Sequence, residues 1–271
     1  MSDVAVMTSR SGRVKSARRL TARATRASER LFLAEGPQAV REALALPGCV
    51  VEVFATPAAT DRLEKLRRHA RVQSLQWHLV DEPALDSLAD TRTPQGVVAV
   101  CRFIDVGLDE LPWPDIRLLA VCADVRDPGN AGTVIRCADA AGAGAVVLTG
   151  SSVDPYNAKT VRASAGSLFH LPVVVAPAVK QSLATISAHG LVVLAADGGG
   201  SVSLDDLEPA LLVGRTAWLF GNEAWGLPPE LRAVADHVVA VPMYGGAESL
   251  NLATAAAICL YASAREQHRA P

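Results

Sequence analysis

The sequence has no long apolar run. Within its 271 residues, no stretch of about eighteen uncharged apolar residues occurs, which is the length that a membrane span needs. Residues 1–10 also contain no apolar segment of the kind found in secretory signals. We therefore expect neither a membrane span nor a signal, and we predict a cytoplasmic protein.

Cysteine is scarce, and its copies are widely separated. The five residues stand singly among apolar neighbours: Cys49, Cys101, Cys122, Cys137 and Cys259. They form no C-x-x-C pair and show no metal-ligand spacing with histidine, so the common zinc motifs are excluded and no metal cofactor is expected. We predict small core residues rather than catalytic thiols, because none of the five lies in a basic or polar turn.

The glycine pattern of a dinucleotide-binding site is also missing. Residues 127–132 read DPGNAG, which does not supply the G-x-G-x-x-G that opens the first helix of such a domain. A nucleotide-binding oxidoreductase is therefore disfavoured. A hydrophobic content of 50% over 271 residues instead predicts one large or two medium globular domains, without specifying their chemistry.

Charge is low overall but unevenly distributed. The net charge is −2, yet the chain through Asp105 has 16 Lys and Arg against 12 Asp and Glu, and the remainder has 10 against 16. Most of the early cations form one cluster: Arg10, Arg13, Lys15, Arg18, Arg19, Arg23, Arg26 and Arg30. Such a cluster suits binding to a phosphate backbone. A solvated helix face and an Arg-rich transit peptide remain alternative interpretations.

Apolar periodicity predicts two α/β domains. Residues 13–30 are expected to be helical and, with the alternating helices and strands that follow, to form a first domain over 1–104. Residues 105–115 contain glycine and two prolines without any period, so they are expected to be a linker. In 116–271, apolar strands alternate with helices, which predicts a mostly parallel sheet covered on both faces.

Two loops of the second domain are unusually polar, and they follow predicted strands, where open parallel sheets bind their ligands. The first, DVRDPGN, leads into a helix that carries Arg136, and Asn130 is a candidate N-cap of that helix. The second, LFGNEAWGLP, contains Gly221, which would let a ligand approach the backbone, and the carboxylate of Glu223. Each loop taken alone is also typical of an ordinary turn.

A third such loop, VPMYGGAESLN, precedes an alanine-rich helix for which Ser249 is a plausible N-cap. Taken together, the segments DPGNAGTVIRCADAAGAGAVVL, LFGNEAWGLP and VPMYGGAESLNLATAAAICLYA resemble the three motifs of the SpoU (TrmH-type) family of knotted RNA methyltransferases. The earlier segments RLFLAEGPQAVREAL and TRTPQGVVAV are similar to the substrate-binding domain that precedes many members, which has a fold like that of certain RNA-binding ribosomal proteins.

The resemblance implies an S-adenosylmethionine-dependent methyltransferase that acts on a ribose 2′-hydroxyl of RNA. The front domain favours large-subunit ribosomal RNA as the substrate. Transfer RNA as the substrate, or a non-catalytic ribosome-associated RNA-binding protein, remains an alternative. The family also implies a trefoil knot in the second domain and an obligate homodimer whose active sites borrow residues from the partner. The small-residue face of the last helix and the first-motif helix are the expected interface.

The resemblance also assigns roles to individual residues. Cofactor binding falls to Leu194, Gly221, Val241, Met243 and Leu250. The functional polar positions are Asn130, Arg136, Glu223, Ser249 and Asn251. RNA contacts are expected from Arg13, Arg18, Arg19, Arg23 and Arg162.

Two of these assignments leave a choice open. Ala165 stands where some antibiotic-resistance members carry a second arginine, and Arg162 is expected to substitute for it. Arg136 is expected to serve methyl transfer either as the base or, still charged, as a clamp on the adjacent phosphate.

Overall fold

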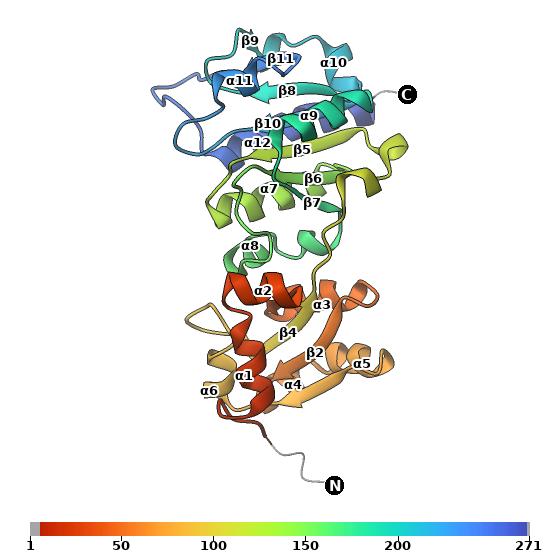
Figure 1. Ribbon diagram of the computed structural model, residues 1–271, viewed down its shortest axis with the longest axis vertical. Helices are drawn as coiled ribbons and strands as arrows, with labels where there is room; N and C mark the ends of the chain where they lie inside the picture. The colour runs from red at the N-terminus through yellow and green to blue at the C-terminus, as the bar shows by residue number, and fades with distance from the viewer. Residues whose placement is uncertain (1–5, 270–271) are drawn as a thin grey trace. The chain divides into compact units, whose positions relative to one another are not determined.

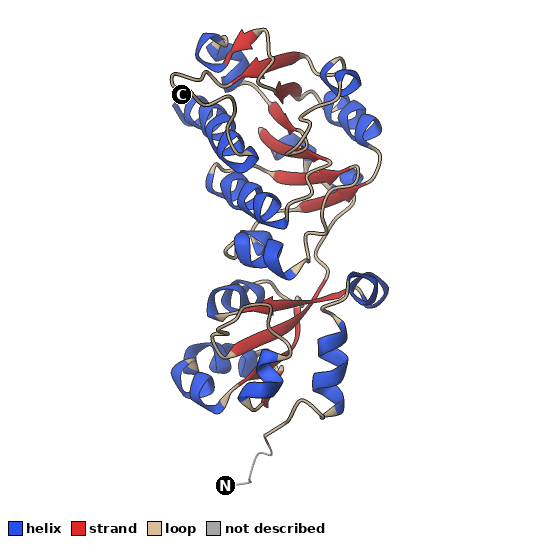
Figure 2. Ribbon diagram, turned by 90° about the vertical axis from the view of Figure 1, so that its left-hand side faces the viewer, coloured by secondary structure: helices blue, strands red, loops and turns tan. Residues whose placement is uncertain are grey.

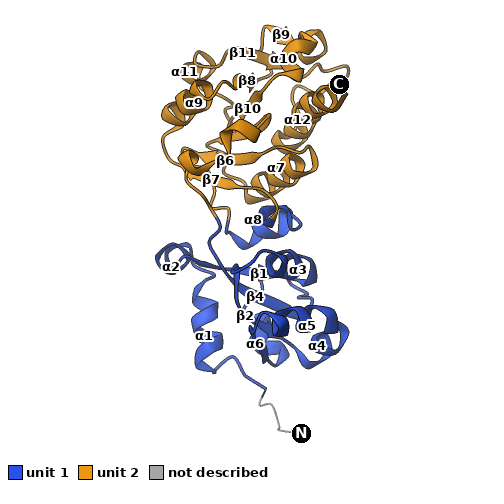
Figure 3. Cartoon of the chain, turned by 90° about the vertical axis from the view of Figure 1, so that its right-hand side faces the viewer, with its two compact units in different colours: residues 1–104, 156–169 blue, residues 105–155, 170–271 orange. Residues whose placement is uncertain are grey.

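The chain folds into two units, which Figure 3 shows in different colours. The computed structural model describes residues 6–269. Unit 1 comprises Met1–Ile104 and Tyr156–Phe169, and unit 2 comprises Asp105–Pro155 and His170–Pro271. This division differs from the expected one in two places, because residues 105–115 belong to unit 2 and residues 156–169 belong to unit 1.

Unit 1 contains a four-stranded sheet, visible in Figure 1. Its strands, in spatial order, are β1 (Leu31–Glu35), β4 (Val97–Arg102), β2 (Val50–Ala55) and β3 (Gln76–Leu79). β4 is antiparallel to both of its neighbours, and β2 is parallel to β3. Every residue of β4 except Arg102 is buried, as expected of a strand in the middle of a packed sheet.

Six helices precede β4 in the chain: α1 (Gly12–Arg19), α2 (Arg23–Glu29), α3 (Pro37–Ala45), α4 (Pro57–Arg62), α5 (Glu64–Val72) and α6 (Glu82–Asp86). The single helix expected over 13–30 is therefore two helices. Between them, the buried guanidinium of Arg26 donates to the carbonyl oxygens of Leu20 at 3.0 Å and Thr21 at 2.8 Å. The chain can turn there because the carbonyls released by the first helix still have a donor.

Residues 156–169 belong to unit 1 because an aromatic cluster anchors them. The ring of Tyr156 lies 4.7 Å from that of Phe32 and 3.8 Å from that of Phe103. Its hydroxyl accepts a hydrogen bond of 2.8 Å from the backbone N–H of Ile104. This burial of a tyrosine with its polar tip satisfied holds the short helix α8 (Ala158–Ala163) against β1.

Residues 105–115 are not a linker, because their large apolar side chains enter the core of unit 2. Leu111 and Trp113 are buried there with Ile116. The Arg215 guanidinium donates to the carbonyl oxygen of Trp113 and, at 2.9 Å, to that of Ile116. Proline and glycine remove the regular period that predicts a helix or strand, but they do not prevent burial of the residues between them.

The sheet of unit 2 has seven parallel strands, which confirms the predicted mostly parallel α/β domain. In spatial order they are β7 (Val173–Ala176), β6 (Ala145–Thr149), β5 (Leu118–Ala123), β10 (Thr216–Phe220), β8 (Val192–Ala196), β11 (His237–Ala240) and β9 (Val202–Ser203). β9 was not predicted, because a strand of two residues is too short to show the alternation of apolar and polar residues that indicates a strand. The trefoil knot stays a prediction. The order of strands in a sheet does not show whether one part of the chain passes through a loop formed by another part.

Helices lie on both sides of these strands (Figure 2). They are α7 (Pro128–Ala140), α9 (Val179–Ala188), α10 (Pro209–Val213), α11 (Pro229–Arg232) and α12 (Leu252–Arg269). α7 and α12 pack together on one side of the sheet, and α9 and α11 lie on the other (Figure 3). α12 is fixed to the sheet by Ser263, whose hydroxyl oxygen accepts a 2.9 Å hydrogen bond from the buried indole of Trp218.

Four of the five cysteines are buried, as expected of core residues. Burial raises the pKa of Cys122 and of Cys259 to about 12, so neither thiol ionises near neutral pH. Within residues 6–269, no group of three or more metal-ligating side chains occurs, and no helix has the length and apolar character that crossing a membrane needs.

Candidate functional site

The loops that follow β8, β10 and β11 enclose a cavity of about 340 Å³ in unit 2. Four of the five residues expected to bind the cofactor line it: Gly221, Val241, Met243 and Leu250. Leu194 does not, because its side chain is fully buried within β8. The residues that reach the cavity from this strand lie at and beyond its end, namely Ala196, Asp197 and Gly198.

The absence of a side chain at Gly221 allows the backbone of its own loop to pass close by. A Cβ atom at this position would lie 2.4 Å from the carbonyl carbon of Gly226 and 2.7 Å from the nitrogen of Leu227. Both are backbone atoms, which cannot move aside as a flexible side chain would. The close approach that requires a glycine is therefore made by the returning chain of the loop.

The side chains around the cavity combine apolar groups with negative charge. Val241, Met243 and Leu250 supply apolar surface, while Asp197 and Glu248 supply carboxylates, as does Glu223. No lysine or arginine is among the lining residues. The cavity therefore suits a ligand that has an apolar ring system and carries positive charge.

One carboxylate joins the three polar loops. Glu223 accepts hydrogen bonds from the backbone N–H groups of Arg126 at 3.1 Å and Asp127 at 3.0 Å, and from Asn130 Nδ2 at 3.2 Å. Asn130 Oδ1 in turn accepts from Asn251 Nδ2 at 3.0 Å. The structure thus brings three of the predicted polar residues together in one network.

This network also sets the ionisation of Glu223. Partial burial raises the pKa of the carboxyl. The opposing effect is larger in sum, because the carboxylate accepts hydrogen bonds from its own backbone N–H, from Arg126 and Asp127, and from the Asn130 amide. The net result is a pKa below the ordinary value, so Glu223 is an anion at neutral pH.

The two helix caps differ from the expected ones by a few residues. Asp127 caps α7, because its Oδ1 accepts from the N–H of Asn130 at 2.8 Å. Asn251 caps α12, because its Oδ1 accepts from the N–H of Ala253 at 2.9 Å. Asn130 lies inside its helix, and Ser249 lies before the cap, where it lines the cavity. Both side chains are therefore released from capping.

Arg136 lies on the exposed side of α7. Its guanidinium makes no hydrogen bond or ion pair with any residue of 6–269, and it is not among the residues lining the cavity. The residue that the sequence singled out for methyl transfer is thus a solvated cation outside the cavity of its own chain.

The cations expected to contact RNA differ in their surroundings. Arg18, Arg19 and Arg23 are exposed, while Arg13 is exposed but forms an ion pair of 2.8 Å with Glu52. Arg26, which the sequence placed in the same cluster, is 5% exposed and serves the turn described above. Buried in this way, Arg26 is not available to a phosphate.

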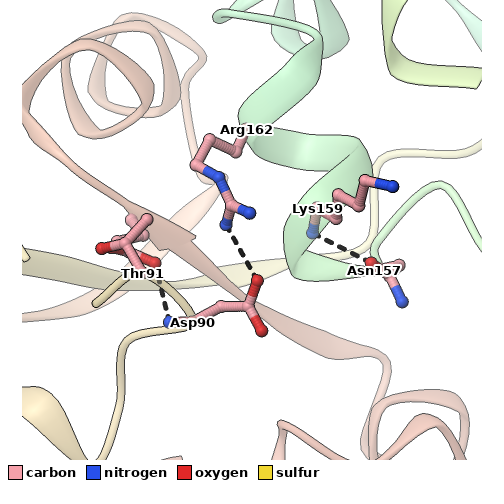
Figure 4. A network of polar contacts seen from close by, with 6 residues as sticks. Asp90, Thr91, Asn157, Lys159 and Arg162 are labelled. Carbon is pink, nitrogen blue, oxygen red and sulfur yellow. Dashed lines mark hydrogen bonds and ion pairs between the residues drawn. The ribbon is translucent and has the colours of Figure 1, made fainter. Parts of the chain in front are cut away.

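Arg162 lies on α8 in unit 1 and is engaged there (Figure 4). Its guanidinium pairs with the carboxylate of Asp90 at 3.0 Å, and the N–H of Asp90 donates to Glu35 at 2.9 Å. Ala165, with a φ of +51°, lies in the turn that ends α8, and its carbonyl oxygen accepts from Gln38. The expectation that Arg162 stands in for an arginine at position 165 stays a prediction, and an RNA contact would have to compete with this exposed ion pair.

Asp197, Glu248 and Asn222 belong to the site but were not assigned from the sequence. Asn222 holds the second loop, since its Nδ2 donates to the carbonyl oxygen of Asp124 at 2.7 Å and its Oδ1 accepts from Ala224 at 2.8 Å. The available signal was position: Asp197 and Asn222 each come shortly after a buried strand. Nothing distinguished Glu248 from other exposed acids.

Residues 117–261 match the model of the SpoU rRNA Methylase family, and residues 12–99 match the model of the MRM3-like substrate binding domain. The second match lies within unit 1, and the first covers residues of unit 2 together with 156–169 of unit 1.

Individual relatives are similar over nearly the whole chain. The 23S rRNA (guanosine(2553)-2′-O)-methyltransferase RlmP of Bacillus subtilis is 34% identical, covering 92% of this chain and 94% of the relative. An AdoMet-bound rRNA methyltransferase from Sinorhizobium meliloti superposes with a TM-score of 0.85 at 31% identity, over 98% and 99% of the two chains. The methyltransferase AviRb from Streptomyces viridochromogenes with AdoMet gives 0.82 at 30% identity, over 95% and 99%.

Glu223 makes stability depend on pH in a predictable direction. A carboxyl whose folded-state pKa is depressed stabilises the fold above the unfolded-state value of about 4.3 and loses that contribution as pH falls through the folded-state value. Glu223→Gln removes this titration. Its deficit in free energy of unfolding against wild type should therefore be largest near pH 6 and shrink as the pH falls below about 4.

Urea unfolding of both proteins across this range measures the difference. Glu208→Gln is the matched control, since Glu208 is an exposed acid of the same unit whose carboxylate makes no hydrogen bond with residues 6–269. A Glu223→Gln deficit that stays constant with pH would show that the network does not depend on the charge.

Proposed function

Because this chain belongs to the SpoU rRNA methylase family, we propose that it transfers the methyl group of S-adenosylmethionine to a ribose 2′-hydroxyl of 23S ribosomal RNA. The observation that carries the proposal is the cavity lined by the second and third motif loops, one of whose lining residues, Glu223, also connects to the first motif loop. A purely RNA-binding protein would have no use for such a cavity. The match of residues 12–99 of this chain to a substrate-binding domain, together with the similarity to a relative named as a 23S rRNA methyltransferase, favours ribosomal over transfer RNA.

The cavity fits the cofactor chemically. S-adenosylmethionine supplies an electrophilic methyl group on a positively charged sulfur. Met243 and Leu250 offer apolar surface for an adenosine, and the carboxylate of Glu248 complements the cofactor's cationic sulfonium and ammonium groups. Asp197 also lines the cavity, where its carboxylate is paired with Arg232 at 3.6 Å. The lining residues also present no cation that would repel the cofactor.

Arg136 is assigned to the RNA side of the reaction. A ribose 2′-hydroxyl is a poor nucleophile, so the site must favour loss of its proton. The Arg136 guanidinium is exposed and forms no ion pair with the residues of 6–269, so its forked N–H groups are open to a phosphate. It therefore acts as a forked clamp on the adjacent phosphate and stabilises the developing alkoxide, rather than serving as the base.

The exposed side of α7, which carries Arg136, and the adjoining side of α12 support a homodimer. The small side chains of Ala253, Ala256 and Ala264 are buried within the chain, so they do not form the expected interface. The exposed stripe of α12 instead carries Ile258 and Tyr261. It adjoins the exposed side of α7, since the Tyr261 hydroxyl lies 3.4 Å from the carbonyl oxygen of Ala140.

Two copies joined through these stripes would each present Arg136 to the other. Because Arg136 lies outside the cavity of its own chain, we assign it to the cavity of the partner. The RNA then also contacts unit 1 through Arg18, Arg19 and Arg23 on α1 and α2. The cytoplasmic location stays a prediction.

Arg136→Ala should lower the single-turnover rate of methyl transfer by about 100-fold or more while leaving cofactor affinity unchanged, because the lost contact serves the transition state. Transfer from labelled S-adenosylmethionine to unmodified 23S rRNA measures the rate, and calorimetry measures the affinity. Arg136→Lys keeps the charge but not the fork, so it should remain slow at every pH.

A Lys variant that recovers as the pH is raised would instead assign the base to this position. Lys180→Ala removes an exposed cation from the same unit and should be as active as wild type. An Arg136→Ala variant that retains the wild-type rate would remove this residue from the reaction.

Sedimentation equilibrium should give a dimer for wild type at micromolar concentration and a monomer for Ile258→Asp, which places a charge in the apolar stripe. Subunit mixing then tests the shared site. Arg136→Ala and Gly221→Ala, each inactive alone, should regain about a quarter of the wild-type activity when mixed, because half of the dimers hold one intact site of two. Complete inactivity of a mixture shown to contain heterodimers would place Arg136 in its own chain's site.

Binding of RNA should depend on salt through α1 and α2. Each neutralised phosphate of a single strand contributes about −0.7 to the slope of log K against log salt concentration, so replacing Arg18, Arg19 and Arg23 with Ala should flatten it by about 2. The matched control replaces Arg67, Arg68 and Arg71, an exposed triplet on α5 with the same charge. Equal flattening by both triple variants would show a general charge effect.

A further inference from the structure

An exposed tryptophan stands at the rim of the cavity. The side chain of Trp225 is 55% exposed, whereas Trp113 and Trp218 are buried in the core. Its chain neighbours Ala224 and Gly226 both line the cavity. Trp225 therefore lies beside the cavity and contributes little to the core of unit 2.

The turn that carries Trp225 is held rigidly. The backbone N–H of Asn222 donates to the carbonyl oxygen of Gly226 at 3.0 Å, and the N–H of Gly226 donates back at 2.9 Å. Inside this closed turn, the N–H of Ala224 donates to the side-chain oxygen of Asn222 at 2.8 Å. Gly226 supplies the φ of +67° that the turn requires. The indole is thus presented to solvent from a fixed backbone.

A cation lies against the ring. The guanidinium carbon of Arg126 is 5.0 Å from the centroid of the Trp225 ring. The backbone of Arg126 is fixed as well, because its N–H donates to the Glu223 carboxylate. An indole and a guanidinium side by side are the two kinds of side chain on which unpaired nucleobases stack.

We propose that Trp225 and Arg126 form a stacking platform for a nucleobase of the substrate RNA. The platform holds the base beside the cavity, so that the ribose of the target nucleotide faces the methyl donor. Both residues are positioning residues, since they contact the base and not the reacting atoms. This inference rests on the proposed function. It adds to that function a binding site for one base of the substrate RNA, beside the cavity.

Binding of two matched probes tests the platform without any methyl transfer. One probe is a single-stranded RNA of about ten nucleotides, within the span that such surfaces bind, and the other has the same backbone with abasic residues at its centre. Trp225→Ala should weaken binding of the first probe by about 5- to 150-fold, the range measured for the loss of one stacked base, and leave the second unchanged. Trp225→Phe should restore most of the affinity.

Tryptophan fluorescence supplies a second readout. RNA should quench the emission of wild type, and Trp225→Phe should bind RNA without that quenching. Val234→Ala trims another exposed apolar side chain of unit 2 and should change neither probe's affinity. Unchanged titration of S-adenosylmethionine shows that each variant keeps its cavity.

Three results would overturn the platform: equal loss of affinity for both probes, no loss for either, or Trp225 emission that RNA leaves unaltered because another surface covers the ring. Failure of the proposed function gives a different pattern, in which base-dependent binding persists but no methyl group reaches 23S rRNA. Intact methyl transfer without base-dependent binding removes the platform alone.

Discussion

The carboxylate of Glu223 is the interaction on which the site depends. It accepts from two backbone N–H groups at the start of the first motif and from Asn130, and Asn130 connects onward to the cap of α12 through Asn251. Loops that follow different strands are thereby tied by hydrogen bonds to one anion. A charged acceptor forms stronger hydrogen bonds than a neutral one, so a single residue can hold the walls of the cavity in register.

Acidic side chains line the cavity, whereas basic side chains lie on the surface outside it. The cavity is lined by Asp197 and Glu248 as well as Glu223, without any cation, which suits a positively charged cofactor. Arg126 and Arg136 lie outside it and are exposed. Asp197 is paired with Arg232 at 3.6 Å, whereas Arg126 and Arg136 are turned to solvent, where they can meet a polyanion. The same arrangement explains why a chain with a net charge of −2 can act on RNA.

Much of this could be predicted from the sequence, and the rest could not for identifiable reasons. The parallel sheet follows from its apolar strands, and the three loops follow from polar residues placed at strand ends. Burial of Trp113 was missed because prolines around it erase any period. The assignment of Tyr156 to unit 1 was missed because an aromatic contact distant in sequence decides it. Leu194 stays a prediction as a cofactor residue, because it lies two residues before Ala196, the first residue of its strand that lines the cavity.

Gly221 has a second reason to be a glycine that its motif does not reveal. It lines the cavity, as the sequence predicts for a residue that admits a ligand, and its missing side chain also makes room for Gly226 and Leu227. The tight return of the loop presents Glu223 towards the first motif and Trp225 towards solvent, two residues apart. A larger residue at 221 would shift both at once. The glycine therefore couples the network that shapes the cavity to the surface proposed to hold the RNA base, and neither could be altered independently by a change at this position.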